Sequence, residues 1–113
     1  MRKTWMIAQY LRTRARWRLD RADESDEGRN ARSAIGLIDA AAHTEELDES
    51  DRIIVRLTVA GCFVHGRFHP GVEGERIIRF WHYEDACGGP AELLEELAAA
   101  AERGLVPLPR ARA

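Results

Sequence analysis

The residues of this sequence with the most reactive side chains gather between positions 62 and 87. The chain has four histidines and two cysteines, and only His43 lies outside that interval. Imidazole and thiolate are the ligands that zinc prefers, in a closed site of four ligands or a catalytic site of three plus water. The residues that could supply such a site are Cys62, His65, His69 and His82.

The spacing of these ligands does not favour a ready-made metal site. Histidines four residues apart share a helix face, but Gly66 and Pro70 make the segment from His65 to His69 a poor helix. A paired C-x2-C, typical of zinc sites, is also missing. The competing interpretation, which we favour, is a small buried thiol at Cys62 with histidines in a solvated loop. A zinc-binding protein or small metalloenzyme is the alternative function.

Cys87 stands just before the expected last helix, where a helix N-terminus could lower the pKa of a thiol and activate it. His82 could then act as its base, but no carboxylate has a recognisable spacing that would orient the imidazole. The sequence also lacks a phosphate-binding loop, a dinucleotide fingerprint and a serine-nucleophile elbow. We therefore expect a protein that is not an enzyme.

The length and composition set the scale for any site. We expect a single globular domain over residues 1–104 and a short flexible C-terminal tail over residues 105–113. A content of 45% hydrophobic and 32% charged residues excludes a disordered chain, and a net charge of −2 implies no strongly charged partner. Without an export signal or an apolar run of about 18 residues, we expect a cytoplasmic protein with reduced thiols.

Residues 4–22 decide where most of the aromatic and basic side chains point. At a helical period, one stripe holds Trp5, Ala8, Leu11, Ala15, Leu19 and Ala22. The segment LRTRARWRL also alternates like a strand. Because the helical period holds over a longer stretch than the alternation, we expect a helix.

Most other segments also have helical patterns. Residues 29–47 predict a helix whose narrow stripe contains Ala31, Ala34, Ile35, Ile38, Ala41 and Ala42. Residues 52–60 are ambiguous, because their β-branched side chains suit a strand, whereas a cap at Ser50 or Asp48 and a stop at Gly61 favour a helix. We expect the helix.

The C-terminal half completes the expected fold. Residues 75–83 predict a helix, and the clearest helix runs from Pro90 to Gly104. We expect a mostly α domain, a small bundle of four or five helices in which a loop from Cys62 to Gly74 joins two halves. The alternative is an α+β domain with a short β-hairpin around residues 53–82.

The segment EGRNARSAIGLIDAAA (27–42) resembles stretches of small uncharacterised proteins from high-GC actinobacteria. The resemblance covers part of the chain only and implies no activity.

A second side of the first helix suggests the leading function. Met6, Tyr10 and Trp17 cluster there beside arginines, and Trp, Tyr and Arg dominate the binding energy of protein interfaces. We expect a cytoplasmic protein-interaction or regulatory protein that self-associates into a homo-oligomer, unless another helix of the chain covers the cluster. The expected partner-binding residues are Trp5, Tyr10, Arg14, Trp17, Arg18 and Arg21.

Nucleic-acid binding through the N-terminal arginines is the second alternative. In a helix, Arg12 and Arg16 lie on one side, and Arg14, Arg18 and Arg21 lie nearly opposite, which splits the positive charge. Only a strand would align these side chains into one basic ladder.

Overall fold

The computed structural model describes residues 2–105 and confirms a mostly helical domain with one short hairpin. The described helices are α1 (Lys3–Asp20), α2 (Arg29–Glu45), α3 (Arg52–Val59), α4 (Gly71–Phe80) and α5 (Pro90–Gly104), with a short 3-10 turn η1 (Glu24–Asp26). The two strands, β1 (Phe63–Val64) and β2 (Arg67–Phe68), form an antiparallel hairpin inside the interval that the alternative fold allowed.

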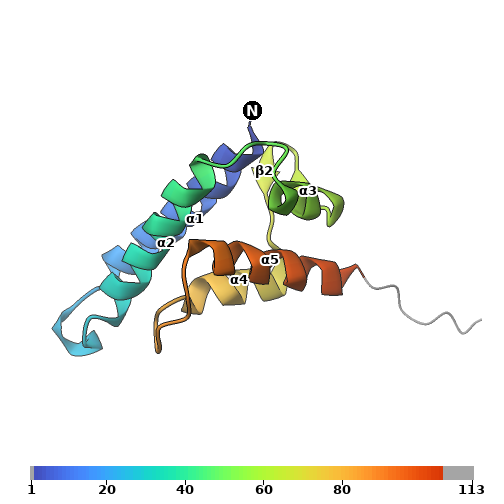
Figure 1. Cartoon of the computed structure of the whole chain (residues 1–113). Helices are drawn as coiled ribbons and strands as arrows, with labels where there is room; N and C mark the ends of the chain where they lie inside the picture. The colour runs from blue at the N-terminus through green and yellow to red at the C-terminus, as the bar shows by residue number, and fades with distance from the viewer. Residues whose placement is uncertain (1, 106–113) are drawn as a thin grey trace, which may run out of the picture.

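Two helical pairs make up the body of the molecule. Figure 1 shows α1 and α2 running antiparallel as one long hairpin, while α4 and α5 lie side by side and extend away from it. Helix α5 is the central helix of the packing, because it contacts α2, α3 and α4. Its leucines Leu93, Leu94 and Leu97 are almost completely buried and form the middle of the core.

Helix α1 is a helix as expected, but its buried face is rotated relative to the predicted stripe. Trp5 and Leu19 are exposed, while Thr4, Ile7 and Arg18 are buried. The cause is that α1 has neighbours on two sides, with α2 on one and β2 and α4 on the other. A stripe drawn for a single neighbour therefore misses the residues that face the second one.

Only part of the stripe that the sequence predicted for α2 is buried. Ala34 and Ala41 are fully buried, whereas Ile35 and Ile38 expose 59% and 42% of their surface. Small side chains at the buried positions let α1 and α2 approach closely, and this turns the isoleucines out of the contact.

The segment predicted as a loop from Cys62 to Gly74 contains the hairpin and the start of α4, so that prediction was wrong. His65 and Gly66 form its turn with positive φ values of 52° and 73°, the backbone of a type I′ turn that matches strand twist. Phe68 is buried and packs edge-on against the Tyr10 ring at 5.5 Å between centroids. The hairpin thus covers one end of α1.

The last helix starts and ends where the sequence placed it, and the carboxylate of Glu92 accepts a hydrogen bond from the Gly89 N–H at 2.8 Å. Apart from Leu105, the predicted tail over residues 105–113 lies outside the described residues. Within residues 2–105, no helix is long and apolar enough to cross a membrane.

The residue that caps α3 differs from the two that the sequence analysis proposed. The Asp51 carboxylate accepts a hydrogen bond from the Ile53 N–H at 2.9 Å, so neither Ser50 nor Asp48 is the cap. The Asp51→Ala variant should lose about 1 kcal/mol of unfolding free energy, because a helix N–H loses its acceptor. Urea denaturation measures this, with Asp48→Ala as the matched control. Equal losses in the two variants would contradict the assignment.

Candidate functional site

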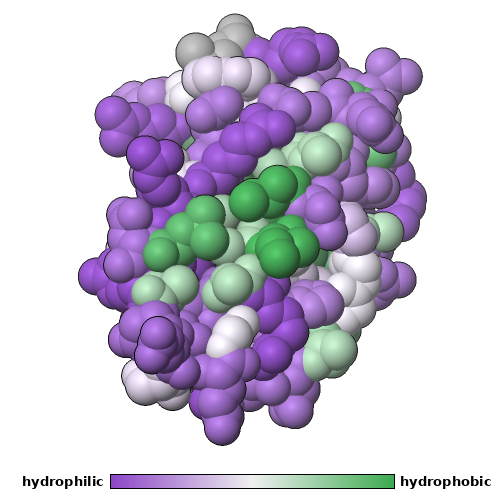
Figure 2. Space-filling model, turned by 90° about the vertical axis from the view of Figure 1, so that its left-hand side faces the viewer, coloured by the Kyte–Doolittle hydropathy of each residue, from purple (hydrophilic) through white to green (hydrophobic). Residues whose placement is uncertain are grey.

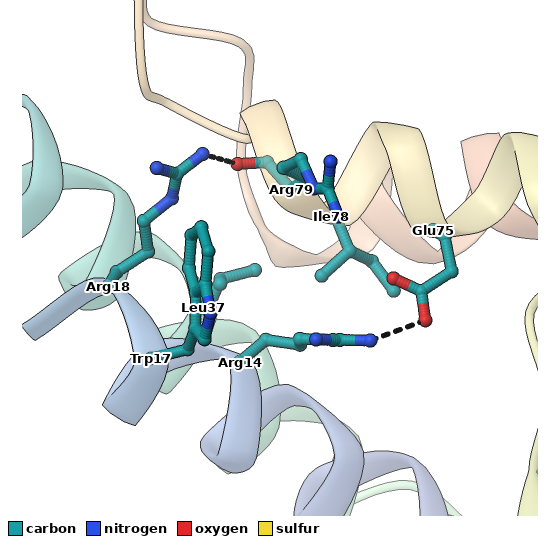
Figure 3. Close-up of a pocket in the computed structure, with 7 residues that line it drawn as sticks. All are labelled: Arg14, Trp17, Arg18, Leu37, Glu75, Ile78 and Arg79. Atoms are coloured by element: carbon teal, nitrogen blue, oxygen red, sulfur yellow. Dashed lines mark hydrogen bonds and ion pairs between the residues drawn. The ribbon is translucent and has the colours of Figure 1, made fainter. Parts of the chain in front are cut away.

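A crevice between α1, α2 and α4 brings arginines from two helices around one indole. It encloses a cavity of about 40 Å³ lined by Arg14, Trp17, Arg18, Leu37, Glu75, Ile78 and Arg79. Figure 3 shows Trp17 between the side chains of Arg14 and Arg18, with Arg79 and Glu75 on the facing helix α4. Three of the residues predicted to bind a partner therefore line one cavity.

Arg18 is the most unusual residue of this crevice. Only 6% of its surface is exposed. One guanidinium nitrogen donates to the Asn30 side-chain oxygen at 3.1 Å, and another donates to the Arg79 carbonyl (Figure 3). The Nε group is buried and has no hydrogen-bond partner. Burial lowers the pKa of Arg18 from its usual value, because desolvation disfavours the charged form.

Aromatic rings take the place of a carboxylate beside Arg18. Its guanidinium lies 4.2 Å from the Tyr83 ring centroid and 5.0 Å from that of Trp17. The same indole has Arg21 at 3.8 Å and Arg79 at 6.0 Å. A ring face attracts a cation through its quadrupole but carries no net charge, so these contacts leave the positive charge in place.

Glu75 is the single acidic residue in the lining of the cavity. Its carboxylate pairs with Arg14 at 2.6 Å and also accepts a hydrogen bond from the Tyr10 hydroxyl. Neither Arg18 nor Arg79 has a carboxylate within ion-pair distance among residues 2–105. Two positive charges of the cavity are therefore not balanced by an adjacent acid.

The six residues predicted to bind a partner differ in exposure and do not form one continuous surface. Tyr10, Arg14 and Arg18 make contacts within the chain, as the sequence allowed if a second helix covered this side. Trp5 and Arg21 are exposed and Trp17 is half-buried. Trp5, Tyr10 and Arg14 also line an open hollow of about 450 Å³ beside the hairpin. A role of these residues in partner binding stays a prediction.

The four predicted zinc ligands have different surroundings. Cys62 is 2% exposed, and its burial raises the pKa of the thiol. His65 and His69 are exposed at the hairpin, and the His82 Nε2 donates to the Gly88 carbonyl at 2.7 Å. In the described part of the chain, no three His, Cys, Asp or Glu residues are placed to hold a metal ion. Zinc binding stays a prediction.

The thiol of Cys87 is exposed and lies in a tight loop with His82. Its sulfur accepts a hydrogen bond from the His82 backbone N–H and donates to the Asp85 carbonyl, both at 3.3 Å. The imidazole itself is held by Gly88. The loop therefore uses these two residues for backbone contacts, and both cysteines of the chain are free thiols.

A second candidate surface lies on the outside of the α1–α2 hairpin. Figure 2 views this side and shows an apolar patch surrounded by hydrophilic residues. The exposed large apolar residues of the two helices are Trp5, Leu19, Ile35 and Ile38. The sequence reading assigned Ile35 and Ile38 to the buried stripe and so missed this surface. The sequence did hold a signal for this surface, namely the alanine-lined face of α2. A face that packs closely against its neighbour through alanines leaves no room to bury two isoleucines as well.

No protein-family model, curated protein or solved structure matches this chain.

The two cysteines should differ sharply in reactivity. At neutral pH, one thiol per chain should react rapidly with a disulfide reagent, since Cys87 is exposed while Cys62 is buried and its thiolate is disfavoured. Absorbance of the released thiolate measures the rate. The Cys87→Ser variant should lose the rapid phase and Cys62→Ser should keep it. Two rapid thiols would contradict the burial of Cys62, and stoichiometric zinc released with the second thiol would support the metal alternative.

Proposed function

We propose that the protein is a non-enzymatic interaction protein that self-associates through the outer face of α2. The observation that carries the proposal is the order of small and large residues along this face. Ala31, Ile35, Ile38 and Ala42 are separated by four, three and four residues and form one stripe on a helix. The three residues Ile35, Ile38 and Ala42 are exposed, and Ala31 is half-buried.

This stripe is symmetrical about the point midway between Ile35 and Ile38. In an antiparallel pair of α2 helices, each Ile35 would therefore meet Ile38 of the second copy, and each Ala31 would meet Ala42. Alanine at both ends allows the helix axes to approach closely, while the isoleucines fill the centre. Two-fold dimers use one surface of both subunits, and a stripe with this symmetry is self-complementary.

The charges beside the stripe are arranged in nearly the same way, with a midpoint one residue away from that of the stripe. Arg32 and Asp39 are exposed and lie on one border of the stripe. The Arg32 guanidinium donates hydrogen bonds to the His82 and Tyr83 carbonyls at 3.1 and 2.8 Å, which leave its positive charge unbalanced by an acid. With a rise of 1.5 Å per residue, Arg32 of one copy would lie about 3 Å along the axis from Asp39 of the other. Asp39 has no ion pair among the described residues. Opposite charges thus face each other in this register.

Helix α1 extends the surface. Arg12 forms a two-pronged ion pair with Glu45 at 2.7 and 2.9 Å, so this side of α1 borders the stripe. Leu19 lies on the same side as Arg12, seven residues along the helix, and is 46% exposed. The contact would therefore be helix hairpin against helix hairpin, as in a four-helix bundle. The two free thiols fit the reducing cytoplasm that we propose as its location.

The Ile38→Arg variant should convert a dimer into a monomer, because the isoleucine centre of the stripe would have to bury a charge. Sedimentation equilibrium measures the mass. The matched control is Val59→Arg on α3, which is 75% exposed and lies outside the stripe of α2. A wild-type chain that stays monomeric at high protein concentration would refute the proposal. A dimer that both substitutions leave intact would refute it as well.

A charge exchange tests the register separately. Asp39→Arg should weaken the dimer by placing two arginines together, and adding Arg32→Asp should restore it. Because Arg32→Asp also loses the hydrogen bonds to the His82 and Tyr83 carbonyls, thermal unfolding of the double variant checks that its fold is kept. Each single opposite-charge contact at such an exposed border contributes up to about 1 kcal/mol, so a five-fold change in the dissociation constant is expected per site. Failure of the double variant to recover would contradict the antiparallel register while leaving Ile38→Arg as the test of the face.

A further inference from the structure

The crevice between α1 and α4 has a charge imbalance that continues along α4. A groove of about 460 Å³ shares Arg14, Glu75 and Arg79 with the inner cavity and adds Arg76, Val72 and Phe80. Together the two hollows are lined by Arg14, Arg18, Arg76 and Arg79 against one carboxylate, that of Glu75. Arg18, Arg76 and Arg79 have no carboxylate within ion-pair distance among residues 2–105. Of these three, Arg18 and Arg79 line the inner cavity.

Arg18 also lacks an acceptor for one of its hydrogens. Buried polar groups are nearly always hydrogen-bonded, and leaving one unpaired is costly. The Nε group of Arg18 is buried without a partner, although the other two nitrogens of its guanidinium are bonded. The nearest acid along these bonds is Asp26, which is reached only through the Asn30 amide at 2.8 Å. An oxyanion in the cavity would supply both the missing acceptor and the missing charge.

We propose that this crevice binds the phosphate group of a small organic phosphate, with Arg18 and Arg79 as its ligands. A phosphate monoester carries nearly two negative charges at neutral pH, which matches the two unbalanced guanidinium groups better than a singly charged carboxylate does. The guanidinium group of Arg79 can offer phosphate oxygens the fixed fork of arginine donors, whereas Arg18 has only its Nε group without a hydrogen-bond partner. The inner cavity of about 40 Å³ has room for a few atoms only, so the organic part would lie in the outer groove against Val72 and Phe80.

The arrangement favours a small molecule over a nucleic acid. A nucleic-acid backbone needs a row of cations along an open surface, whereas the arginines of α1 are divided between two sides. Arg12 is engaged with Glu45 on the side away from Arg14 and Arg18. Arg16 and Arg67 also have no carboxylate within ion-pair distance among residues 2–105, but neither lines the two hollows, so the cations do not form one row.

Calorimetric titration with phenyl phosphate at low salt tests the site. Binding is expected, and Arg79→Gln should weaken it about tenfold or more, because a hydrogen bond between charged groups is lost. Arg79 is exposed, so the variant should fold normally, which circular dichroism checks. The matched control is Arg67→Gln, an exposed arginine on β2 outside the crevice, which should change the affinity by less than about twofold. Benzoate should bind at least about tenfold more weakly than phenyl phosphate.

Three results would overturn the proposal. One is no heat of binding with millimolar phenyl phosphate, and another is equal affinity in wild type and Arg79→Gln. The third is tight binding of a single-stranded oligonucleotide that Arg79→Gln abolishes while phenyl phosphate does not bind, which would assign the crevice to nucleic acid. Arg18→Gln, if folded, should weaken binding like Arg79→Gln. Repeating the titration on Ile38→Arg separates this site from self-association, since phosphate binding should not change.

Discussion

The fold depends on one buried cation that joins three helices. Arg18 belongs to α1, binds Asn30 at the start of α2, and donates to the carbonyl of Arg79 in the last turn of α4. The C-terminal end of a helix carries partial negative charge, so a guanidinium group is favourable there. Together with the bonds of Tyr10 and Arg14 to Glu75, this group holds α1 and α4 on the two sides of the crevice. The residue that positions the crevice is thus also the one that gives it an unbalanced charge.

Much of the fold follows from local sequence signals. Proline at the start and glycine at the end defined α5, and the absence of glycine and proline up to Glu27 favoured α1. The turn at His65 and Gly66 was harder to predict, because type I′ turns prefer Asn, Asp or Gly at the position that His65 occupies. Each strand has two residues, too few for an alternating pattern to show. Local signals therefore gave the helices, whereas the hairpin was predicted only as part of the alternative fold, within residues 53–82 and without the position of its strands.

The candidate sites were less predictable, because they depend on which helix faces meet. The sequence placed Arg14, Arg18 and Arg21 on one side of α1 and Arg12 on the other, and the helical structure agrees. It held no indication that Arg79, more than fifty positions further on, would join them, nor that Arg18 would be buried. A buried arginine looks like any other in an arginine-rich sequence. Ile35 and Ile38 were misplaced for a related reason, since hydrophobicity alone does not distinguish an inner from an outer stripe.

The two proposed surfaces use opposite sides of α1, and this separation has a physical cause. A helix between two neighbours has two flanks, each set by residues three or four positions apart. Arg12 and Leu19 are on the flank next to the exposed stripe of α2, whereas Arg14 and Arg18 face α4. A second copy docked on the α2 stripe would leave the crevice open, so a dimer would present two crevices, one on each outer side. Among residues 2–105, the Arg18–Asn30 hydrogen bond and Leu37, which lines the cavity, connect the crevice to α2. Any coupling between the two surfaces would use these contacts.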